Sequence, residues 1–336
     1  MKRAFIEQIM QQTGLSQATV YRALGFHGHI DSQTALMVHQ LAEALGYHPN
    51  SEVKQTPFCG VILPEIPHYY WDSVHASLTE ALVRYSISYQ SVLFSNFFDL
   101  EFFFLALDSL LDFSPKVLVI AAPNHPEVKK RLLDISKTIP IFLLGERIHA
   151  KNIFYFGRND LQDGIALGKA FRQAYPDRSR ILVLDIPQHE LRTEGFLSVC
   201  NDMEAVGRIQ LPICHSGYSS ILARSIVSKV TEPFDCVYCS TGMLPRVCLA
   251  LDKLKIDPNV ICIGYENPPA NRRFWQNGRI GLTLCQDIAA QSAACAKAVA
   301  KLYTDRCFPD RKNNYIEFRI LFPPGKATET ASSYNV

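Results

Sequence analysis

The sequence lacks the long apolar run of a membrane-spanning helix, since no stretch approaches the roughly 18 residues required. Residues 1–7 also lack the apolar segment of a secretory signal, so we expect a cytoplasmic protein without a membrane anchor. There is little excess of either charge: 34 Lys and Arg residues face 32 Asp and Glu residues, and a net charge of +2 favours no particular partner. Tandem repeats are absent, and a hydrophobic content of 48% excludes a disordered chain.

The glycine patterns that hold nucleotide phosphates are missing as well. Neither Gly-x-Gly-x-x-Gly nor Gly-x-x-x-x-Gly-Lys-Ser/Thr occurs. No Ser/His/Asp or Cys/His set has the spacing of a catalytic motif. We therefore predict a protein that is not an enzyme, with no catalytic residues and no cofactor.

Ten cysteines are scattered along the chain rather than clustered. Most lie in apolar segments and, without an export signal, are expected to be buried reduced thiols. Cys236 and Cys239 have the spacing of half a zinc site or of a redox motif. They lie in a strand-like run, where residues three apart point to opposite faces, and no second pair completes a site. We therefore predict no metal site.

Residues 1–50 contain helix signals but no strand signal. Gly14 is placed to end a first helix, and Ser16 is placed to cap a second. A third helix is expected between Asp31 and Gly46. Two short helices that meet at a glycine-containing turn predict a helix–turn–helix.

From Phe58 onwards, short apolar runs alternate with amphipathic stretches. This alternation predicts parallel sheets with helices on both faces, and the number of strands favours two doubly wound lobes over one. Ligands of such folds bind at the carboxyl ends of the strands. The expected strands are Phe58–Leu63, Ser91–Phe94, Val117–Ala121, Ile139–Leu144, Ile181–Leu184, Cys236–Cys239, Val260–Gly264 and Ile280–Leu284. The expected helices include Trp71–Ser86, Asp99–Asp112, Leu161–Ala174, Ser219–Val230 and Asp287–Tyr303.

Residues 41–50 read Leu-Ala-Glu-Ala-Leu-Gly-Tyr-His-Pro-Asn and close the N-terminal segment. Together with the second helix, they resemble the headpiece of the lactose-repressor (LacI/GalR) family of bacterial transcription regulators. The resemblance continues through the core, in the family's order, over residues 5–325. The core motifs that carry it are Pro64–Trp71, Asn159–Gly164, Arg192–Phe196, Gly264–Asn267 and Thr283–Asp287.

The resemblance implies an N-terminal all-α helix–turn–helix headpiece and a two-lobed α/β core of the periplasmic-binding-protein type. It implies a homodimeric regulator, a repressor, that binds double-stranded operator DNA. It also implies a small polar effector, a sugar or sugar derivative, bound between the lobes. The corresponding segments are a headpiece over 1–50, a hinge over 51–57, a core over 58–325 and a tail over 326–336. Lobe 1 spans about 58–157 plus a late segment, and lobe 2 about 158–284 plus the C-terminal strand.

The headpiece residues take their expected roles from this resemblance. Gln17 and Ala18 open the recognition helix and are expected to face base edges, because Gln can pair with adenine and Ala can contact a thymine methyl. Arg22 matches the family arginine that reads a base, and Tyr21 replaces the family's serine, where its ring can reach the DNA backbone. The residues expected to hold phosphates or the register are Ser16, Thr19, His29, Thr34 and Asn50. Two of these residues have an alternative, structural role: Ser16 as the cap of the helix and Thr19 as a packing residue.

The hinge is shorter than the family's. Only Ser51–Pro57 separate Asn50 from Phe58, without the leucine that the family inserts into the minor groove. Pro57 also moves Thr56 out of helical geometry. We expect no hinge helix, so that an effector acts through the spacing of the headpieces.

The family's ligand pocket lies between the lobes. Arg192 is the main expected effector contact, because a guanidinium offers a rigid fork to hydroxyls or a carboxylate; its alternative role is an ion pair with Glu190 or Glu194. Glu266 replaces the family's aspartate and reaches one methylene farther. The other candidate contacts are Tyr69, Tyr70, Trp71, Asn124, Glu146 and Asn159, and at least one of the aromatic residues is expected to be plain core.

Three alternatives stay open. Residues 240–243 stand where the family has Asn-Asp-x-Met, and the missing carboxylate leaves room for a nucleobase or another non-sugar ligand. A solute-binding protein for transport would have the same core, although the helix–turn–helix argues against it. A sensor with weak or lost DNA binding is the third, because residues 1–56 have no excess of positive charge for phosphates. The balancing residues are Lys2, Arg3, Arg22 and Lys54 against Glu7, Asp31, Glu43 and Glu52.

Histidines His27, His29, His39 and His48 are the remaining source of positive charge in the headpiece. Their ordinary pKa is about 6.5. We predict that affinity for an operator rises as the pH falls from about 8 to about 6, because protonated imidazoles strengthen phosphate binding. Fluorescence anisotropy of a labelled operator at fixed salt measures this, and affinity that is flat with pH would contradict it.

Overall fold

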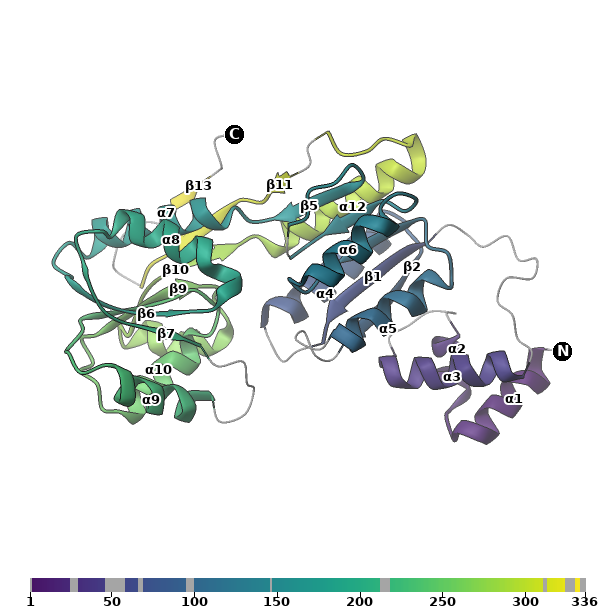
Figure 1. Cartoon of the computed structure of the whole chain (residues 1–336), viewed down its shortest axis with the longest axis horizontal. Coiled ribbons are helices and arrows are strands. Elements are labelled where there is room, and N and C mark those ends of the chain that lie inside the picture. The colour runs from purple at the N-terminus through teal and green to yellow at the C-terminus, as the bar shows by residue number, and fades with distance from the viewer. Residues whose placement is uncertain are drawn as a thin grey trace. The chain divides into compact units, whose positions relative to one another are not determined.

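The chain forms two α/β units, each described here by itself (Figure 1). The computed structural model describes residues 2–24, 30–45, 58–65, 69–94, 100–145, 147–211, 218–310, 313–323 and 330–332. The first unit is Met1–Gly157 with Ile288–Asn314, and the second is Arg158–Asp287 with Tyr315–Val336. Predicted features that lie outside the described residues include the hinge at 51–57, His27, His29, His48, Asn50 and Glu146.

Three helices form the N-terminal part of the first unit: α1 (Lys2–Thr13), α2 (Gln17–Ala23) and α3 (Ser32–Ala44). Gly14 has a φ of +69° between α1 and α2, a conformation that glycine adopts without strain. The Ser16 hydroxyl caps α2 by accepting a hydrogen bond from the Thr19 amide at 3.2 Å. Both the glycine turn and the serine cap predicted from the sequence are confirmed. The buried residues that join the helices are Ile6, Ile9, Val20, Ala23, Leu24, Val38 and Ala42.

A six-stranded sheet forms the rest of the first unit, in the order β11-β5-β4-β3-β1-β2. The strands are β1 (Cys59–Pro64), β2 (Tyr89–Phe94), β3 (Val117–Ile120), β4 (Ile141–Leu143), β5 (Ile153–Gly157) and β11 (Asn313–Tyr315). Strands β1 to β5 pair in parallel. Helices α4 (Tyr69–Arg84) and α12 (Ile288–Asp305) share a buried core with one face of β1. Helices α5 (Leu100–Leu111) and α6 (Pro126–Ile135) complete the unit.

The second unit contains a seven-stranded sheet in the order β13-β12-β10-β9-β8-β6-β7. The strands are β6 (Arg180–Asp185), β7 (Glu204–Gln210), β8 (Cys236–Cys239), β9 (Ile261–Tyr265), β10 (Ile280–Gln286), β12 (Phe318–Leu321) and β13 (Thr330–Ser332). Strands β6 to β10 pair in parallel, and β12 pairs antiparallel with β10. Helices α7 (Asp160–Ala174) and α8 (Glu190–Val199) cover one face. Helices α9 (Tyr218–Lys229), α10 (Leu244–Lys253) and α11 (Arg272–Gln276) cover the other.

The Cys-x-x-Cys pair lies in strand β8, as predicted. Cys236 packs in the core beneath α7 and α8, whereas Cys239 packs in the core beneath α9 and α10. The two thiols therefore point to opposite faces of the sheet. In the described part of the chain, no group of three or more His, Cys, Asp or Glu residues is placed to hold a metal ion. The same part contains no helix with the length and apolar content to cross a membrane.

The eight expected strands and five expected helices are present, and their ends differ from the predictions by at most two residues. Strands β5, β7, β11 and β13 and helices α6, α8, α10 and α11 were not predicted. Strand β7 lies at the edge of its sheet with most side chains partly or fully exposed, so its sequence contains no apolar run.

Helices α7 and α8 pack backbone against backbone. A Cβ added at Gly164 would lie 2.1 Å from the carbonyl oxygen of Arg192, and one added at Gly195 would lie 2.2 Å from that of Leu161. Real Cβ atoms do not approach a backbone oxygen this closely. The crossing therefore requires glycine at both positions.

We predict that Gly195→Ala lowers the free energy of unfolding by at least about 3 kcal/mol, because the added methyl must push the two helices apart. Gly207→Ala is the matched control, since its Cβ would meet the nearest atom, of Val230, at 3.3 Å and should cost about 1 kcal/mol. Urea denaturation followed by circular dichroism measures both. Equal losses in the two variants would show that the helix crossing tolerates a side chain.

Candidate functional site

The candidate site lies at the carboxyl ends of the strands in the second unit. Because β6, β8, β9 and β10 are parallel, their carboxyl ends meet at one edge of the sheet. Helices α7 and α8 bring their first turns to the same edge. Buried and half-buried polar side chains gather there, among them Arg192 and Glu266, which the sequence analysis singled out.

Arg192 on α8 forms an ion pair with Asp160, the first residue of α7. Its Nε donates to Asp160 Oδ1 at 2.6 Å, and its Nη1 donates to the carbonyl of Ser240 at 3.4 Å. The guanidinium also stacks over the ring of Tyr265, with 4.7 Å between its carbon and the ring centroid. Burial disfavours the charge on Arg192, but Asp160, Tyr265 and Asp163 together outweigh burial and raise the pKa of Arg192. The ion pair with Glu190 or Glu194 that was considered from the sequence is thus not the one formed.

A second ion pair, between Arg158 and Asp163, lies deeper. Nε of Arg158 donates to Asp163 Oδ2 at 2.8 Å, and its Nη2 lies 2.6 Å from Oδ1. The side chains are only 5% and 1% exposed. A two-pronged contact of this kind is the geometry in which a buried ion pair is best satisfied.

Glu266 directly follows strand β9 and has a φ of +62°, which is rare for a residue with a side chain. Its carboxylate accepts a hydrogen bond from Nε2 of Gln286 at 3.1 Å, and the residue is 8% exposed. Burial raises the pKa of Glu266 to about 7, even though the charges of Arg158 and Arg192 act in the opposite direction. Oε1 of Gln286 is buried and has no hydrogen-bond partner among the described residues.

The predicted aromatic contacts belong to the first unit, at the start of α4. Tyr69 is 41% exposed. Tyr70 and Trp71 pack against the core, and the Tyr70 hydroxyl donates to Gln291 Oε1 at 3.2 Å. Both side chains remain partly exposed, so the prediction that at least one of the three is plain core stays a prediction. Of the amide candidates, Asn124 is exposed in the loop after β3.

Asn159 has a structural role that the sequence analysis did not assign. Its side-chain oxygen accepts a hydrogen bond from the amide of Gln162 at 3.4 Å and so caps α7. The structure instead brings Arg158, Asp160, Asp163 and Gln286 to the site. Three of these lie in or next to the Asn159–Gly164 motif, but the sequence does not tell which acid pairs with which arginine.

The expected DNA-contacting residues occupy the outer face of α2. Gln17, Ala18, Tyr21 and Arg22 are exposed, whereas Val20 is buried in the core of the three helices. Nε of Arg22 donates to the carbonyl of Ala18 at 3.1 Å, which lays its side chain along the helix surface.

Two further headpiece residues are placed by α3. The Thr34 amide donates a hydrogen bond to Oδ1 of Asp31 at 2.9 Å near the start of the helix. Burial lowers the pKa of His39. The backbone of Ala23 and the charge of Asp112 act in the opposite direction, but burial has the larger effect. His39 therefore contributes less positive charge near neutral pH than its ordinary pKa implies.

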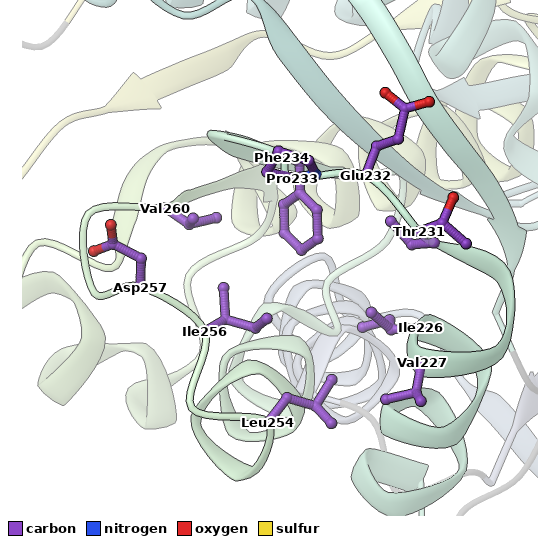
Figure 2. A pocket seen from close by; sticks show the side chains of 11 residues that line it. Ile226, Val227, Thr231, Glu232, Pro233, Phe234, Leu254, Ile256, Asp257 and Val260 are labelled. Carbon is purple, nitrogen blue, oxygen red and sulfur yellow. The ribbon is translucent and has the colours of Figure 1, made fainter.

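A pocket of about 390 Å³ lies at the opposite, amino-terminal edge of the same sheet, beside the segments that lead into β8 and β9 (Figure 2). Its lining is mainly apolar and consists of Ile226, Val227, Val230, Thr231, Glu232, Pro233, Phe234, Leu254, Ile256, Asp257 and Val260. None of the residues predicted to contact an effector belongs to it.

Comparison with known proteins identifies the core. Residues 59–306 match the family model of the periplasmic binding protein domain. The comparison with curated proteins gives no match.

Three solved structures illustrate the likeness. GanP, a glucose-galactose binding protein from Geobacillus stearothermophilus, has a TM-score of 0.69 at 15% identity, covering 81% of this chain and 99% of that one. A carbohydrate transporter solute binding protein from Agrobacterium radiobacter, in complex with D-arabinose, has a TM-score of 0.70 at 16% identity, covering 81% and 96%. A structure assigned to a LacI transcriptional regulator from Bacteroides fragilis has a TM-score of 0.67 at 18% identity, covering 80% and 98%. At these identities the likeness shows the fold alone.

We predict that the free energy of unfolding falls as the pH rises from about 4.5 to about 7 because of Glu266. In that range the folded protein retains a proton that the unfolded chain has released, so folding becomes less favourable until Glu266 ionises in both states. The loss attributable to this residue is about 3 kcal/mol. Urea denaturation of the native protein and of Glu266→Gln at several pH values isolates it as the difference between the two curves. A difference that does not change with pH would contradict the raised pKa.

Proposed function

The chain belongs to the periplasmic binding protein domain family, and from this premise we propose that it is a DNA-binding transcription regulator controlled by a small polar effector. In this proposal residues 1–50 form a helix–turn–helix headpiece that binds double-stranded operator DNA. The core binds the effector and holds two copies of the chain together as a homodimer. We propose that the regulator is a repressor.

The arrangement of α2 carries the proposal. Any amphipathic surface helix exposes one face, so the residue types on that face carry the argument. On α2 the exposed residues are Gln17, Ala18, Tyr21 and Arg22. Gln17 and Ala18 open this short second helix, which follows a glycine turn, and recognition helices present base-reading side chains there. Tyr21 and Arg22 lie one turn farther along the same face. Gln and Arg are the residue types that pair bidentately with adenine and guanine.

The polar network of the second unit supports effector binding in the core. Buried ion pairs and a buried carboxylate at the carboxyl edge of a parallel sheet are typical of a ligand site. Structures with the same fold include a glucose-galactose binding protein and a D-arabinose complex. These two observations favour a sugar or a sugar derivative as the effector.

Regulation then follows from linkage between two binding sites. An effector that binds one arrangement of the core more tightly than another shifts the population toward it. In a dimer this shift changes the spacing of the headpieces, which must enter successive major grooves about one helical turn apart. The reciprocal effect of DNA on effector affinity is required by the same linkage.

A solute-binding protein for transport is the second candidate, favoured by the solute-binding proteins among the similar structures. It requires no operator. Selection of DNA therefore separates the two functions.

We predict that selection from a random pool of double-stranded DNA enriches a palindrome. Gln17→Ala and Arg22→Ala should each lose selectivity at one base position in both half-sites, with a loss of affinity for the selected operator of about 10- to 100-fold. Gln12→Ala, which removes an exposed glutamine from α1, is the matched control and should keep the selected sequence.

The proposal fails if the folded protein enriches no sequence, because a sequence-specific regulator must discriminate. It also fails in part if Gln12→Ala and Gln17→Ala lose selectivity equally. That result would mean that α2 is not the reading helix.

A further inference from the structure

The charged groups of the candidate site are not balanced. Arg192 is paired with Asp160, and Arg158 is paired with Asp163, so each arginine has its own carboxylate. Glu266 is the fifth charged group of this network and brings a further negative charge. When all five groups are ionised, the network therefore has one negative charge in excess.

The surroundings of Glu266 also offer few donors. In the part of the chain that the structure describes, Nε2 of Gln286 is the one side-chain donor to its carboxylate. The other end of the same amide, Oε1 of Gln286, is a buried acceptor without a partner among the described residues. The carboxylate and this amide oxygen thus belong to two side chains that contact each other through Nε2, and both oxygens require hydrogen-bond donors.

We propose that the effector carries a protonated amine, which binds between the carboxylate of Glu266 and Oε1 of Gln286. The proposal rests on the proposed effector-binding function and specifies the chemical class of the ligand. An ammonium group has three donors and no acceptor, so it satisfies both oxygens at once and neutralises the excess charge. A neutral hydroxyl donates only one hydrogen bond and leaves a buried carboxylate without a counter-charge. An anionic ligand would add to the excess.

A proton competes with such a ligand for the carboxylate of Glu266. Burial holds the carboxyl partly protonated near neutral pH, and the amine must displace that proton. The groups that face Glu266 are Arg158, Asp163, Arg192, Cys285 and Gln286. Arg158 and Arg192 favour its ionised form, Asp163 disfavours it, and Gln286 donates to it. Binding of a protonated amine should therefore tighten as the pH rises from about 5.5 to about 7, because Glu266 loses its proton over this range while the amino sugar keeps its own.

Matched pairs of sugars that differ by one ammonium group test the proposal. The probes are D-glucosamine with D-glucose, D-galactosamine with D-galactose, and D-mannosamine with D-mannose. Isothermal titration calorimetry measures the affinity of each probe for the full chain at about pH 5.5 and about pH 7. We expect at least one amino sugar to bind about tenfold or more tightly than its hydroxyl partner at the higher pH, with a smaller preference at the lower pH.

Glu266→Gln should abolish the preference for the amino sugar, because the amide has no charge to offer. Glu194→Gln removes a carboxylate from the exposed surface of α8 and is the control for a general change in charge. It should keep the preference. Retention of the preference in Glu266→Gln would overturn the proposal.

The remaining outcomes separate this proposal from the function on which it rests. Neutral sugars that bind as tightly as their amino partners, or more tightly, would overturn the ammonium site while supporting an effector-binding core. If no probe of either kind binds, the sugar-type effector itself is rejected, and the ammonium site is rejected with it.

Discussion

The close backbone contacts at Gly164 and at Gly195 set the geometry of the candidate site. Helices α7 and α8 approach until the backbone of one occupies the space where the other would place a Cβ. Only at this separation does Asp160, on the first turn of α7, lie within 2.6 Å of Arg192 on α8. The ion pair therefore depends on two residues that have no side chain and no charge. A rigid helix pair is a more accurate support for polar groups than a loop.

The positions of the paired side chains matter for stability because the charges are buried. An arginine held away from water is tolerated only while its carboxylate stays in place, and removing one partner leaves an isolated charge that costs several kcal/mol. The network contains two such pairs, one at Arg158 and one at Arg192. Glu266 differs, because its ordinary response to burial is to take up a proton. The site thus combines two permanent ion pairs with one carboxyl group whose charge depends on its surroundings.

Some elements can be predicted from the sequence and others cannot, depending on whether their buried surface consists of apolar side chains. Strand Val260–Gly264 was predicted because a strand buried on both faces is a continuous apolar run. Helix α8 was not, since its packing surface is the backbone at Gly195 and leaves no apolar stripe in the sequence. In the candidate site, Arg192 and Glu266 were predicted from their positions in sequence motifs. The pairing of Arg192 with Asp160 could not be predicted, because it depends on how α7 and α8 cross. A raised pKa at Glu266 depends on burial, which the sequence does not state.

The chain leaves the first unit after Gly157 and returns to it at Ile288. During synthesis, the first sheet therefore emerges from the ribosome without α12, whose residues Cys295, Ala296 and Val299 complete its core. By the time α12 appears, the whole stretch from Arg158 to Asp287 has already been made. The second unit has to wait in turn for β12, the partner of β10. Neither unit can finish folding before most of the other has been translated, so proteolysis or truncation between them would yield two incomplete cores rather than two separate domains.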